Sequence, residues 1–258
     1  MGAIAKAINE GSTGTAINEG SARTAINEGS ARTVVITGAG GALGGAVAAT
    51  FQQAGWNLGL FEYGAQGAER LRAEYDEAVV VDVDLTNETA TASAVENVLS
   101  ANGRIDALLC IAGGFAMSKA HKSSIADLEH MLDLNVRTLF NSVRAVLPSM
   151  LDKGSGFILG VSAGAALGGS AGMALYAASK SAVATYLDSV RIEMKGRGIR
   201  VTTLYVMDAL DTPANRKSMP GTDPAGWISL EGLADVILTI AESDPRAHVG
   251  EVKVEAKR

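Results

Sequence analysis

Apolar residues occur along most of the chain in short runs that alternate with longer amphipathic stretches. Runs rich in β-branched residues and bounded by Gly, Asn or Asp predict strands at 34–36, 58–61, 79–81, 107–112, 157–161, 199–206 and 249–254. Stretches with apolar positions three or four residues apart predict helices at 43–54, 65–77, 86–100, 126–147, 176–195 and 230–241. Strands and helices that alternate at this spacing are joined by right-handed βαβ crossovers. The pattern therefore predicts an α/β protein, a doubly wound Rossmann-like parallel sheet with helices on both faces, in a single domain.

The first 32 residues break this alternation. The segment Ala7-Ile8-Asn9-Glu10-Gly11-Ser12 recurs at 16–21 and at 25–30, a period of nine residues with one isoleucine in each copy. One apolar residue in nine cannot build a core, and the period is shorter than that of the common solenoid repeats. We expect residues 1–32 to form an arm, mobile or a short helix, and residues 33–258 to form the folded domain. A tandem duplication without a role and a partner-binding or oligomer-capping arm both stay open.

Composition and charge narrow the class of protein. Hydrophobic residues make up 47% of the chain, which is ample for a core, and the net charge of −6 argues against nucleic acid as a partner. Cys110 is the single cysteine, which excludes an internal disulfide and a Cys-rich metal site and suits a reducing cytoplasm. The uncharged span between Lys153 and Lys180 holds seven glycines and four serines, so a strand, a loop and a helix start explain it better than a membrane span.

A glycine-rich turn joins the first predicted strand to the first predicted helix, in the sequence Thr37-Gly38-Ala39-Gly40-Gly41-Ala42-Leu43-Gly44-Gly45. Missing side chains let a diphosphate approach the backbone, and free N–H groups at a helix start attract its charge. The candidate binding residues are Gly38, Gly41, Ala42, Leu43 and Gly44. A tight turn without a ligand is the alternative that this motif alone leaves open.

Glu62 strengthens the dinucleotide interpretation. It ends the second predicted strand, 18 residues after Gly44, close to the position at which a carboxylate holds ribose hydroxyls. A carboxylate there repels a 2′-phosphate, and no arginine follows immediately to offset it. We therefore expect the protein to bind a nicotinamide dinucleotide, with NAD(H) favoured and NADP(H) possible.

Tyr176 and Lys180 stand four residues apart at the predicted start of a helix, so both side chains can enter one cleft. A nearby ammonium favours a phenolate, so we expect Lys180 to lower the pKa of Tyr176. A tuned tyrosine can give a proton to a reduced carbonyl or imine, or take one in the reverse direction. The pair follows the fifth predicted strand of a dinucleotide fold, which favours a catalytic role over that of a surface pair.

From about Thr33 to the C-terminus, these motifs resemble those of the short-chain dehydrogenase/reductase family. Further matching pieces are Asp84-Leu85-Thr86, Cys110-Ile111-Ala112-Gly113, Asn135 and Thr212. The resemblance implies an NAD(P)H-dependent oxidoreductase in which Asp84 and Leu85 lie at the adenine and Ala112-Gly113 beside the adenosine ribose. It further implies that Asn135 anchors a water relay to Lys180. Lys180 would hold the nicotinamide ribose, and Thr212 would meet the carboxamide.

The chain also departs from the family pattern. Ala163 occupies the usual position of a substrate-binding serine, thirteen residues before Tyr176, and the adjacent Ser162 is expected on the opposite side of the strand. Ala42 replaces the second loop glycine, and Met207 stands where Pro-Gly usually begins. Together with segments 109–115 and 210–220, these features resemble the dihydropteridine reductases of this family, which reduce a C=N/quinonoid system and need no serine hydroxyl. Asn135 and Met207 depart from the dihydropteridine reductase pattern.

Three functions follow as hypotheses. The first is a dihydropteridine-reductase-like enzyme that passes a hydride from the nicotinamide to a small planar substrate. The second is a carbonyl ketoreductase in which Ser162 rotates into the site or another donor replaces Ala163. The third is a redox sensor that binds the dinucleotide without turnover. Candidates to line a substrate pocket are Phe115, Ala163, Met207 and Trp227, each of which can equally be a packing residue.

Two further expectations concern metals and partners. His121, His130 and His248 show no metal-ligand spacing, so we expect them to be surface groups and expect no metal site. The family resemblance implies a homodimer or homotetramer formed through the long helices. Apolar stripes at helical spacing occur there, although they can equally face the sheet; they comprise Leu128, Met131, Leu134 and Phe140, and Val183, Leu187, Val190 and Met194.

Overall fold

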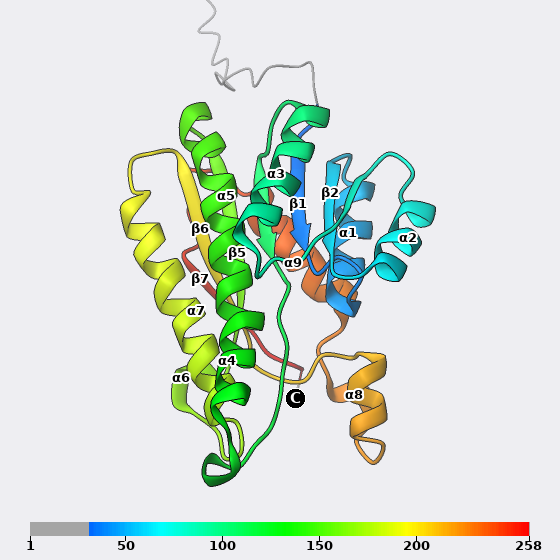
Figure 1. Cartoon of the computed structure of the whole chain (residues 1–258), viewed down its shortest axis with the longest axis vertical. Helices are drawn as coiled ribbons and strands as arrows, with labels where there is room; N and C mark the ends of the chain where they lie inside the picture. Colours follow the sequence, from blue (N-terminus) through cyan, green and yellow to red (C-terminus); the bar gives the residue numbers. More distant parts are fainter. Residues whose placement is uncertain (1–30, 258) are drawn as a thin grey trace, which may run out of the picture. The chain divides into compact units, whose positions relative to one another are not determined.

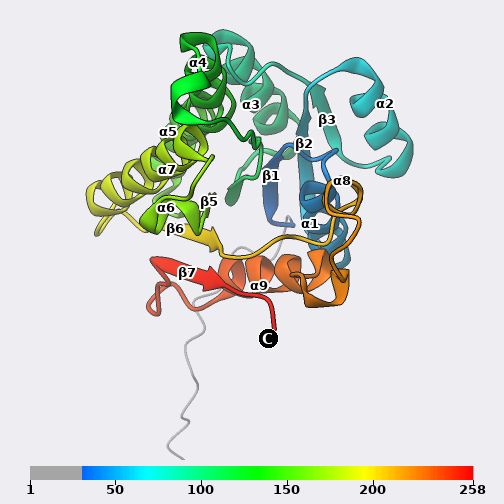
Figure 2. The same cartoon turned by 90° about the horizontal axis from the view of Figure 1, so that it is seen from below.

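The computed structural model describes residues 31–257, which form a seven-stranded parallel sheet covered by helices on both faces (Figures 1 and 2). The strand order is β3-β2-β1-β4-β5-β6-β7, which confirms the doubly wound α/β fold. The three copies of the repeat at residues 1–30 lie outside the described residues, so the N-terminal arm stays a prediction. The strands are β1 (Thr33–Thr37), β2 (Asn57–Glu62), β3 (Val79–Asp82), β4 (Ala107–Cys110), β5 (Gly156–Ala163), β6 (Ile199–Val206) and β7 (Glu251–Val254). The helices are α1 (Ala42–Gln53), α2 (Ala65–Glu74), α3 (Glu88–Asn102), α4 (Ile125–Leu132), α5 (Thr138–Lys153), α6 (Ala165–Gly168), α7 (Ala174–Glu193), α8 (Pro213–Ser218) and α9 (Leu230–Glu242).

The centre of the sheet is buried on both faces, as its continuous apolar runs require. Every residue of β1 is buried, and its register pairs Ile36 with Leu60 of β2 and with Leu109 of β4. Strand order reverses between β1 and β4, and in open α/β sheets ligands bind at the carboxyl ends of the strands at such a point. This edge of the sheet is therefore where the site is expected.

Two apolar layers hold the helices onto the sheet. On one face, Phe51 of α1 and Ile237 of α9 pack against the strands in one cluster of buried residues. On the other face, Val98 of α3, Val143 of α5 and Leu187 of α7 form the second cluster. Figure 2 shows α1 and α9 on one side of the sheet and α3, α5 and α7 on the other. The apolar stripe on α7 belongs to the second cluster, so it faces the sheet rather than a partner.

The structure departs from the predicted elements in four places. The helix expected at 126–147 consists of α4, a π-helical turn at Asp133–Arg137, and α5, which extends to Lys153. The strand expected at 107–112 ends at Cys110, because the N–H groups of Ile111 and Ala112 donate to Thr37 Oγ1 instead of to a neighbouring strand. The short helices α6 and α8 lie in segments where no element is predicted.

Arg32 connects the start of β1 to the helical layer. Its guanidinium lies 4.2 Å from the centroid of the Trp56 ring and pairs with Glu242, which also accepts a hydrogen bond from Trp56 Nε1 at 3.2 Å. The Arg32 carbonyl accepts from Asn57 N at 2.8 Å, so β1–β2 pairing already begins there. Arg32 is therefore packed on the domain, although the repeat pattern assigns it to the arm.

Candidate active site

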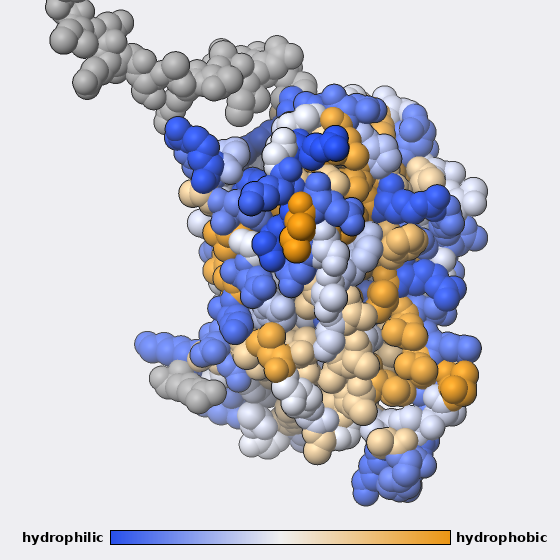
Figure 3. Space-filling model, turned by 90° about the vertical axis from the view of Figure 1, so that its left-hand side faces the viewer, coloured by the Kyte–Doolittle hydropathy of each residue, from blue (hydrophilic) through white to orange (hydrophobic). Residues whose placement is uncertain are grey.

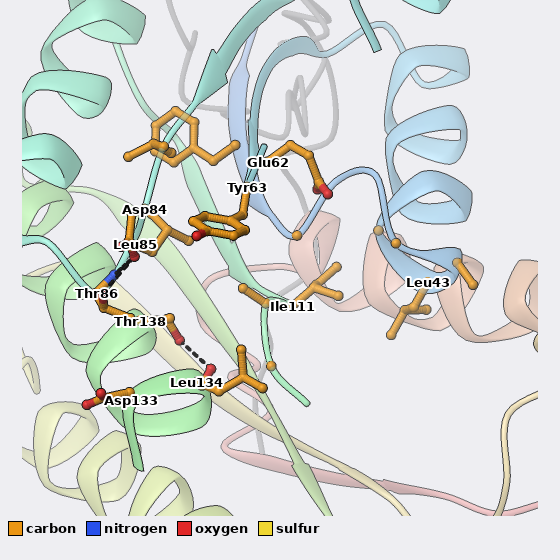
Figure 4. A pocket seen from close by; sticks show the side chains of 18 of the residues that line it. Leu43, Glu62, Tyr63, Asp84, Leu85, Thr86, Ile111, Asp133, Leu134 and Thr138 are labelled. Atoms are coloured by element: carbon orange, nitrogen blue, oxygen red, sulfur yellow. Dashed lines mark hydrogen bonds between the residues drawn. The ribbon is translucent and has the colours of Figure 1, made fainter. Parts of the chain in front are cut away.

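A cavity of about 700 Å³ opens at the carboxyl ends of the strands, beside β1, β2 and β4 (Figure 4). Eleven of the twelve predicted cofactor residues line it, and Lys180 is the one that does not. The lining residues are Gly38, Gly41, Ala42, Leu43, Gly44, Phe61, Glu62, Tyr63, Val83, Asp84, Leu85, Thr86, Ile111, Ala112, Gly113, His130, Asp133, Leu134, Thr138, Thr212 and Ala214. Segments far apart in the sequence thus meet at one end of the sheet.

The glycine-rich turn packs too closely for side chains at two of its positions. Gly38 has φ +67°, and a Cβ there would lie 2.9 Å from Ala112 Cα. A Cβ on Gly44 would lie 2.1 Å from the Gly38 carbonyl oxygen. Thr37 fixes the facing segment, because its Oγ1 accepts from Ile111 N and Ala112 N at 3.0 Å each. The turn therefore offers an open backbone cradle at the start of α1, which suits a diphosphate.

Glu62 ends β2 and faces the turn. Its Oε2 accepts a 2.7 Å hydrogen bond from Gly40 N, which holds the carboxylate at the edge of the cavity. Arg70 of α2 donates to the Gly40 carbonyl oxygen at 2.8 Å and lines an adjoining hollow with Glu62. No arginine follows Glu62 directly in the sequence, but the fold brings Arg70 to the same turn. A cation therefore stands near the carboxylate that was expected to act without one.

The opposite wall is built from the ends of β2 and β3. Figure 4 shows Tyr63 reaching from the end of β2 toward Asp84 and Leu85. Asp84 Oδ1 accepts from Thr86 N at 2.9 Å and from Thr86 Oγ1 at 2.6 Å. The buried Asn141 donates to the Leu85 carbonyl oxygen at 2.8 Å, which anchors this segment to α5. The wall is thus fixed by side-chain hydrogen bonds, and the exposed Tyr63 belongs to the lining of the cavity.

Lys180 and Asn135 adjoin the cavity at Gly113. A Cβ on Gly113 would lie 2.6 Å from Asn135 Oδ1 and 3.2 Å from Lys180 Nζ, so only a glycine leaves these side chains in place. Lys180 Nζ donates to the Val161 carbonyl oxygen at 3.0 Å. Tyr176 lies one turn earlier on α7, half-buried, on the face of the helix that Lys180 shares.

Asn135 joins three segments through its side chain. Its Oδ1 accepts from Gly114 N at 3.0 Å, and its Nδ2 donates to the Gly114 carbonyl oxygen at 3.1 Å. The same Nδ2 donates to Ser179 Oγ at 3.2 Å, and Ser179 Oγ donates in turn to the Tyr176 carbonyl oxygen at 2.8 Å. Asn135 lies within the π-helical turn, a feature that often occurs at functional sites. Its carboxamide therefore connects the 113–115 segment to the helix that carries Tyr176 and Lys180.

The electrostatics of the pair differ from the sequence expectation. Burial raises the pKa of Tyr176, whereas Lys180 was expected to lower it. Burial also lowers the pKa of Lys180 from 10.5 to about 8. The expected direction of the Tyr176 pKa was therefore wrong. The i, i+4 spacing indicates that the two side chains share a helix face, but it does not indicate how much water burial removes from them. Tyr176 is thus held in its protonated form at neutral pH.

Of the four residues expected to contact substrate, Phe115 is the one that the structure places against Tyr176. The Phe115 ring meets the Tyr176 ring edge to face, with centroids 4.9 Å apart. Ala163 is buried at the end of β5 beside Val206, and Met207 follows directly, where it would contact a Cβ on Gly164. Trp227 lies further away along the chain after α8, next to the bridge between Leu210 and Ile228. None of these four belongs to the lining of the cavity described above.

The hydroxyl of Ser162 is already occupied by a hydrogen bond to the backbone of α7. Ser162 is 1% exposed, and its Oγ donates to the Lys180 carbonyl oxygen at 2.9 Å. Rotating Ser162 into the site would break this buried hydrogen bond. The structure therefore disfavours Ser162 as a replacement for the missing family serine.

Sequence reasoning missed several residues of the site. Thr37 and Tyr63 directly adjoin predicted residues, so their positions at strand ends could have indicated them. His130 is exposed, as expected, but it also lines the cavity. Leu134 and Thr138 line it too and were not predicted to do so. Among residues 31–257, no three His, Cys, Asp or Glu side chains gather in a way that could hold a metal ion. In the same range, no helix combines the length and the apolar character needed to cross a membrane.

Comparison with known proteins identifies the class. The model of the short chain dehydrogenase family matches residues 32–221. An uncharacterized oxidoreductase of Staphylococcus haemolyticus is 28% identical over 225 residues, covering 85% of this chain and 94% of the relative. Sulfoacetaldehyde reductase 2 of Chromohalobacter salexigens is 32% identical over 172 residues, covering 65% of this chain and 68% of the relative.

Solved structures agree with this class. A 3-ketoacyl-(acyl-carrier-protein) reductase from Brucella melitensis complexed with NADH has a TM-score of 0.78 and 25% identity, covering 88% of this chain and 97% of that one. ElxO with NADP bound has a TM-score of 0.81 at 18% identity, covering 87% of this chain and 97% of that one, and shows the shared fold.

The chain belongs to the short-chain dehydrogenase/reductase family. It is an oxidoreductase that depends on a nicotinamide dinucleotide, NAD(H) or NADP(H).

Proposed function

We propose that this protein is an NADH-dependent reductase of a small planar substrate with a C=N or quinonoid system, of the kind that dihydropteridine reductases use. The observation that carries this proposal is the environment of Tyr176. Ala163 offers no hydroxyl at the end of β5, and the hydroxyl of Ser162 is committed to the Lys180 carbonyl oxygen. A substrate that accepts its proton on nitrogen needs no second donor to a carbonyl oxygen.

The cavity fits a dinucleotide. The cradle formed by Gly38 and Gly44, which a Cβ would fill, would hold the diphosphate at the start of α1. Glu62 would hold the adenosine ribose hydroxyls, and Asp84 with Leu85 would contact the adenine. A carboxylate at Glu62 disfavours a 2′-phosphate, which supports NADH. Arg70 beside it keeps some use of NADPH within the proposal.

The chain's own groups would position the reaction and move the proton. When bound, the reduced nicotinamide supplies the hydride. Lys180 would hold the nicotinamide ribose next to Gly113, and Thr212 would meet the carboxamide at the other side of the cavity. Tyr176 would donate its phenolic proton to the substrate nitrogen, since burial favours the protonated phenol. Protonated Lys180, one turn away, would then stabilise the phenolate that remains, and the Asn135 segment would support the water relay that restores the proton.

Carbonyl reduction is the second candidate, because relatives such as sulfoacetaldehyde reductase 2 are named for carbonyl substrates. The two candidates differ in whether a hydroxyl at position 163 is needed. Ala163→Ser would restore the usual family donor at the end of β5. We expect this substitution to raise ketone reduction and to leave the reduction of a quinonoid substrate nearly unchanged.

The test is NADH oxidation by the purified protein with quinonoid dihydropterin and, in parallel, with a panel of ketones. The proposal predicts turnover of the pterin with NADH preferred over NADPH. Glu62→Gln should then narrow the difference between NADH and NADPH. Brisk ketone reduction without pterin turnover would refute the substrate proposal in favour of a ketoreductase. Dinucleotide binding without any turnover would favour a redox sensor.

We propose further that the chain acts as a homodimer or homotetramer, in the cytoplasm. Phe140 of α5 is 41% exposed, and its ring contacts Tyr186 of α7 with centroids 5.8 Å apart. Leu132 and Leu151 add exposed apolar surface along α4 and α5, and apolar side chains gather on the lower right of the face shown in Figure 3. A second copy would cover this surface. Light scattering of the wild type should give two or four times the 26.4 kDa chain mass. Phe140→Glu should lower the measured mass toward that of one chain. A monomeric wild type would contradict the proposal.

A further inference from the structure

Phe115 is a large aromatic residue on the surface beside the proposed proton donor. Its side chain is 56% exposed, in the segment between β4 and α4. Even so, its ring packs edge to face on Tyr176, with centroids 4.9 Å apart and an interplanar angle of 85°. Phe115 does not line the cavity that we assign to the dinucleotide. The contact with Tyr176 is therefore the feature of Phe115 that bears on the site.

The backbone on either side of Phe115 is held in place. We call residues 113–118 the strap. At one end, the two hydrogen bonds of Asn135 fix Gly114, and a Cβ on Gly114 would lie 2.1 Å from Leu134 Cδ2. At the other end, Ser118 N donates to the Gly172 carbonyl oxygen at 2.9 Å. A side chain between two fixed ends has a defined position, so the contact with Tyr176 is a built feature of the fold.

The contact bears on the chemistry of the phenol. An apolar ring placed against Tyr176 keeps water from that side, and burial favours the neutral phenol over the phenolate. Lys180, on the same helix face, is the charged group that the proposed mechanism places near the phenol. The same packing restricts rotation of the Tyr176 ring, since aromatic pairs prefer this edge-to-face geometry.

We propose that Phe115 is a positioning residue for Tyr176: its ring fixes the direction of the phenol and excludes water from it, so that the proton is delivered to substrate rather than to solvent. This inference rests on the proposed role of Tyr176 as proton donor. Asn135 contributes indirectly to the position of the Phe115 ring, because it fixes the adjacent Gly114.

The first experiment measures Tyr176 without turnover. Tyrosinate absorbance is titrated in the wild type and in Tyr176→Phe, and the difference isolates one of the five tyrosines. The same subtraction is made in a Phe115→Ala background, a Phe115→Trp background and a Met117→Ala background. Met117 is the matched control, because it lies on the same strap and is 61% exposed. We expect Phe115→Ala to move the Tyr176 titration to lower pH, and Phe115→Trp and Met117→Ala to leave it in place.

The second experiment measures kcat against pH with whichever substrate the turnover assay of the proposed function identifies. Loss of orientation should lower kcat of Phe115→Ala by about 10- to 100-fold, with the basic limb moved to lower pH and the NADH Kd unchanged. Phe115→Trp should recover most of the loss. The proposal is overturned if Phe115→Ala raises only KM and leaves the titration in place, or if Met117→Ala shifts it equally. Retained activity in Tyr176→Phe would instead refute the proposed function, and the titration would still report on the contact.

Discussion

Replacing Lys180 by methionine tests how strongly the fold opposes the charge that the reaction needs. Lys180 is 6% exposed, and burial lowers its pKa from 10.5 to about 8. Between these two pH values the unfolded chain binds more protons than the folded one, so the free energy of unfolding rises with pH. Below pH 8 the folded state carries the full penalty, and above pH 10.5 the penalty is gone.

The magnitude follows from the shift. One pKa unit corresponds to about 1.4 kcal/mol, so burial of the ammonium costs about 3 kcal/mol at neutral pH. Roughly 2.5 kcal/mol of this is recovered by pH 10. Lys180→Met removes the penalty and also the hydrogen bond to the Val161 carbonyl oxygen, which contributes about 1 kcal/mol at every pH. The change in the mutant's effect between the two pH values is therefore the quantity that isolates the charge.

The assay is urea unfolding of the wild type and Lys180→Met at pH 7 and pH 10. Lys195→Met, which removes an exposed lysine just after α7, corrects for the loss of one positive charge. We expect the mutant to gain about 2.5 kcal/mol relative to wild type at pH 7 compared with pH 10, while losing activity. The same stability difference at both pH values would show that burial does not destabilise the charged form of Lys180, and the reasoning would fail.

Three more substitutions test other parts of the account. Gly44→Ala places a Cβ 2.1 Å from the Gly38 carbonyl oxygen, so it should lower the free energy of unfolding by about 1–3 kcal/mol and weaken NADH binding in a fluorescence titration; unchanged affinity would contradict the cradle. Ser162→Ala should cost about 1 kcal/mol in urea unfolding and leave kcat nearly unchanged, whereas a large loss of kcat would place the hydroxyl in the reaction. Burial raises the pKa of Asp106, but hydrogen bonds from Arg104, Lys153 and Thr33 N outweigh burial, so the net pKa is lowered. The ionised carboxylate therefore stabilises the fold fully above pH 3.8, and this contribution is lost as the pH falls further. Asp106→Asn should lower stability by about 2 kcal/mol at pH 7 and less in acid, as measured by thermal unfolding; an equal loss at both pH values would refute the electrostatic explanation.

The alternation of strands and helices along the chain and the glycine cradle could be predicted from the sequence because both depend on local patterns. Continuous apolar runs identify buried strands, and a glycine-rich turn between a strand and a helix carries its own meaning. The right-handed crossover rule then places Gly38, Glu62 and Asp84 at one edge of the sheet. Eleven predicted residues meet there around the cavity.

Other features depend on packing that no local pattern reports. The π-helical turn around Asn135 interrupts a stretch whose apolar spacing is typical of one continuous helix. Arg70 of α2 reaches Gly40, and Phe115, between β4 and α4, meets Tyr176 of α7. The direction of the Tyr176 pKa depends on how much water the surrounding chain removes, which spacing along a helix cannot give.

The most direct test of the central claim is the kcat of Tyr176→Phe, measured together with its Kd for NADH. Phenylalanine keeps the ring and its contact with Phe115 but removes the proton that Tyr176 is proposed to donate. We predict a loss of kcat of about 100-fold or more with the NADH Kd unchanged, the size expected for removal of a general acid. A variant that reduces its substrate at nearly the wild-type rate would contradict the claim.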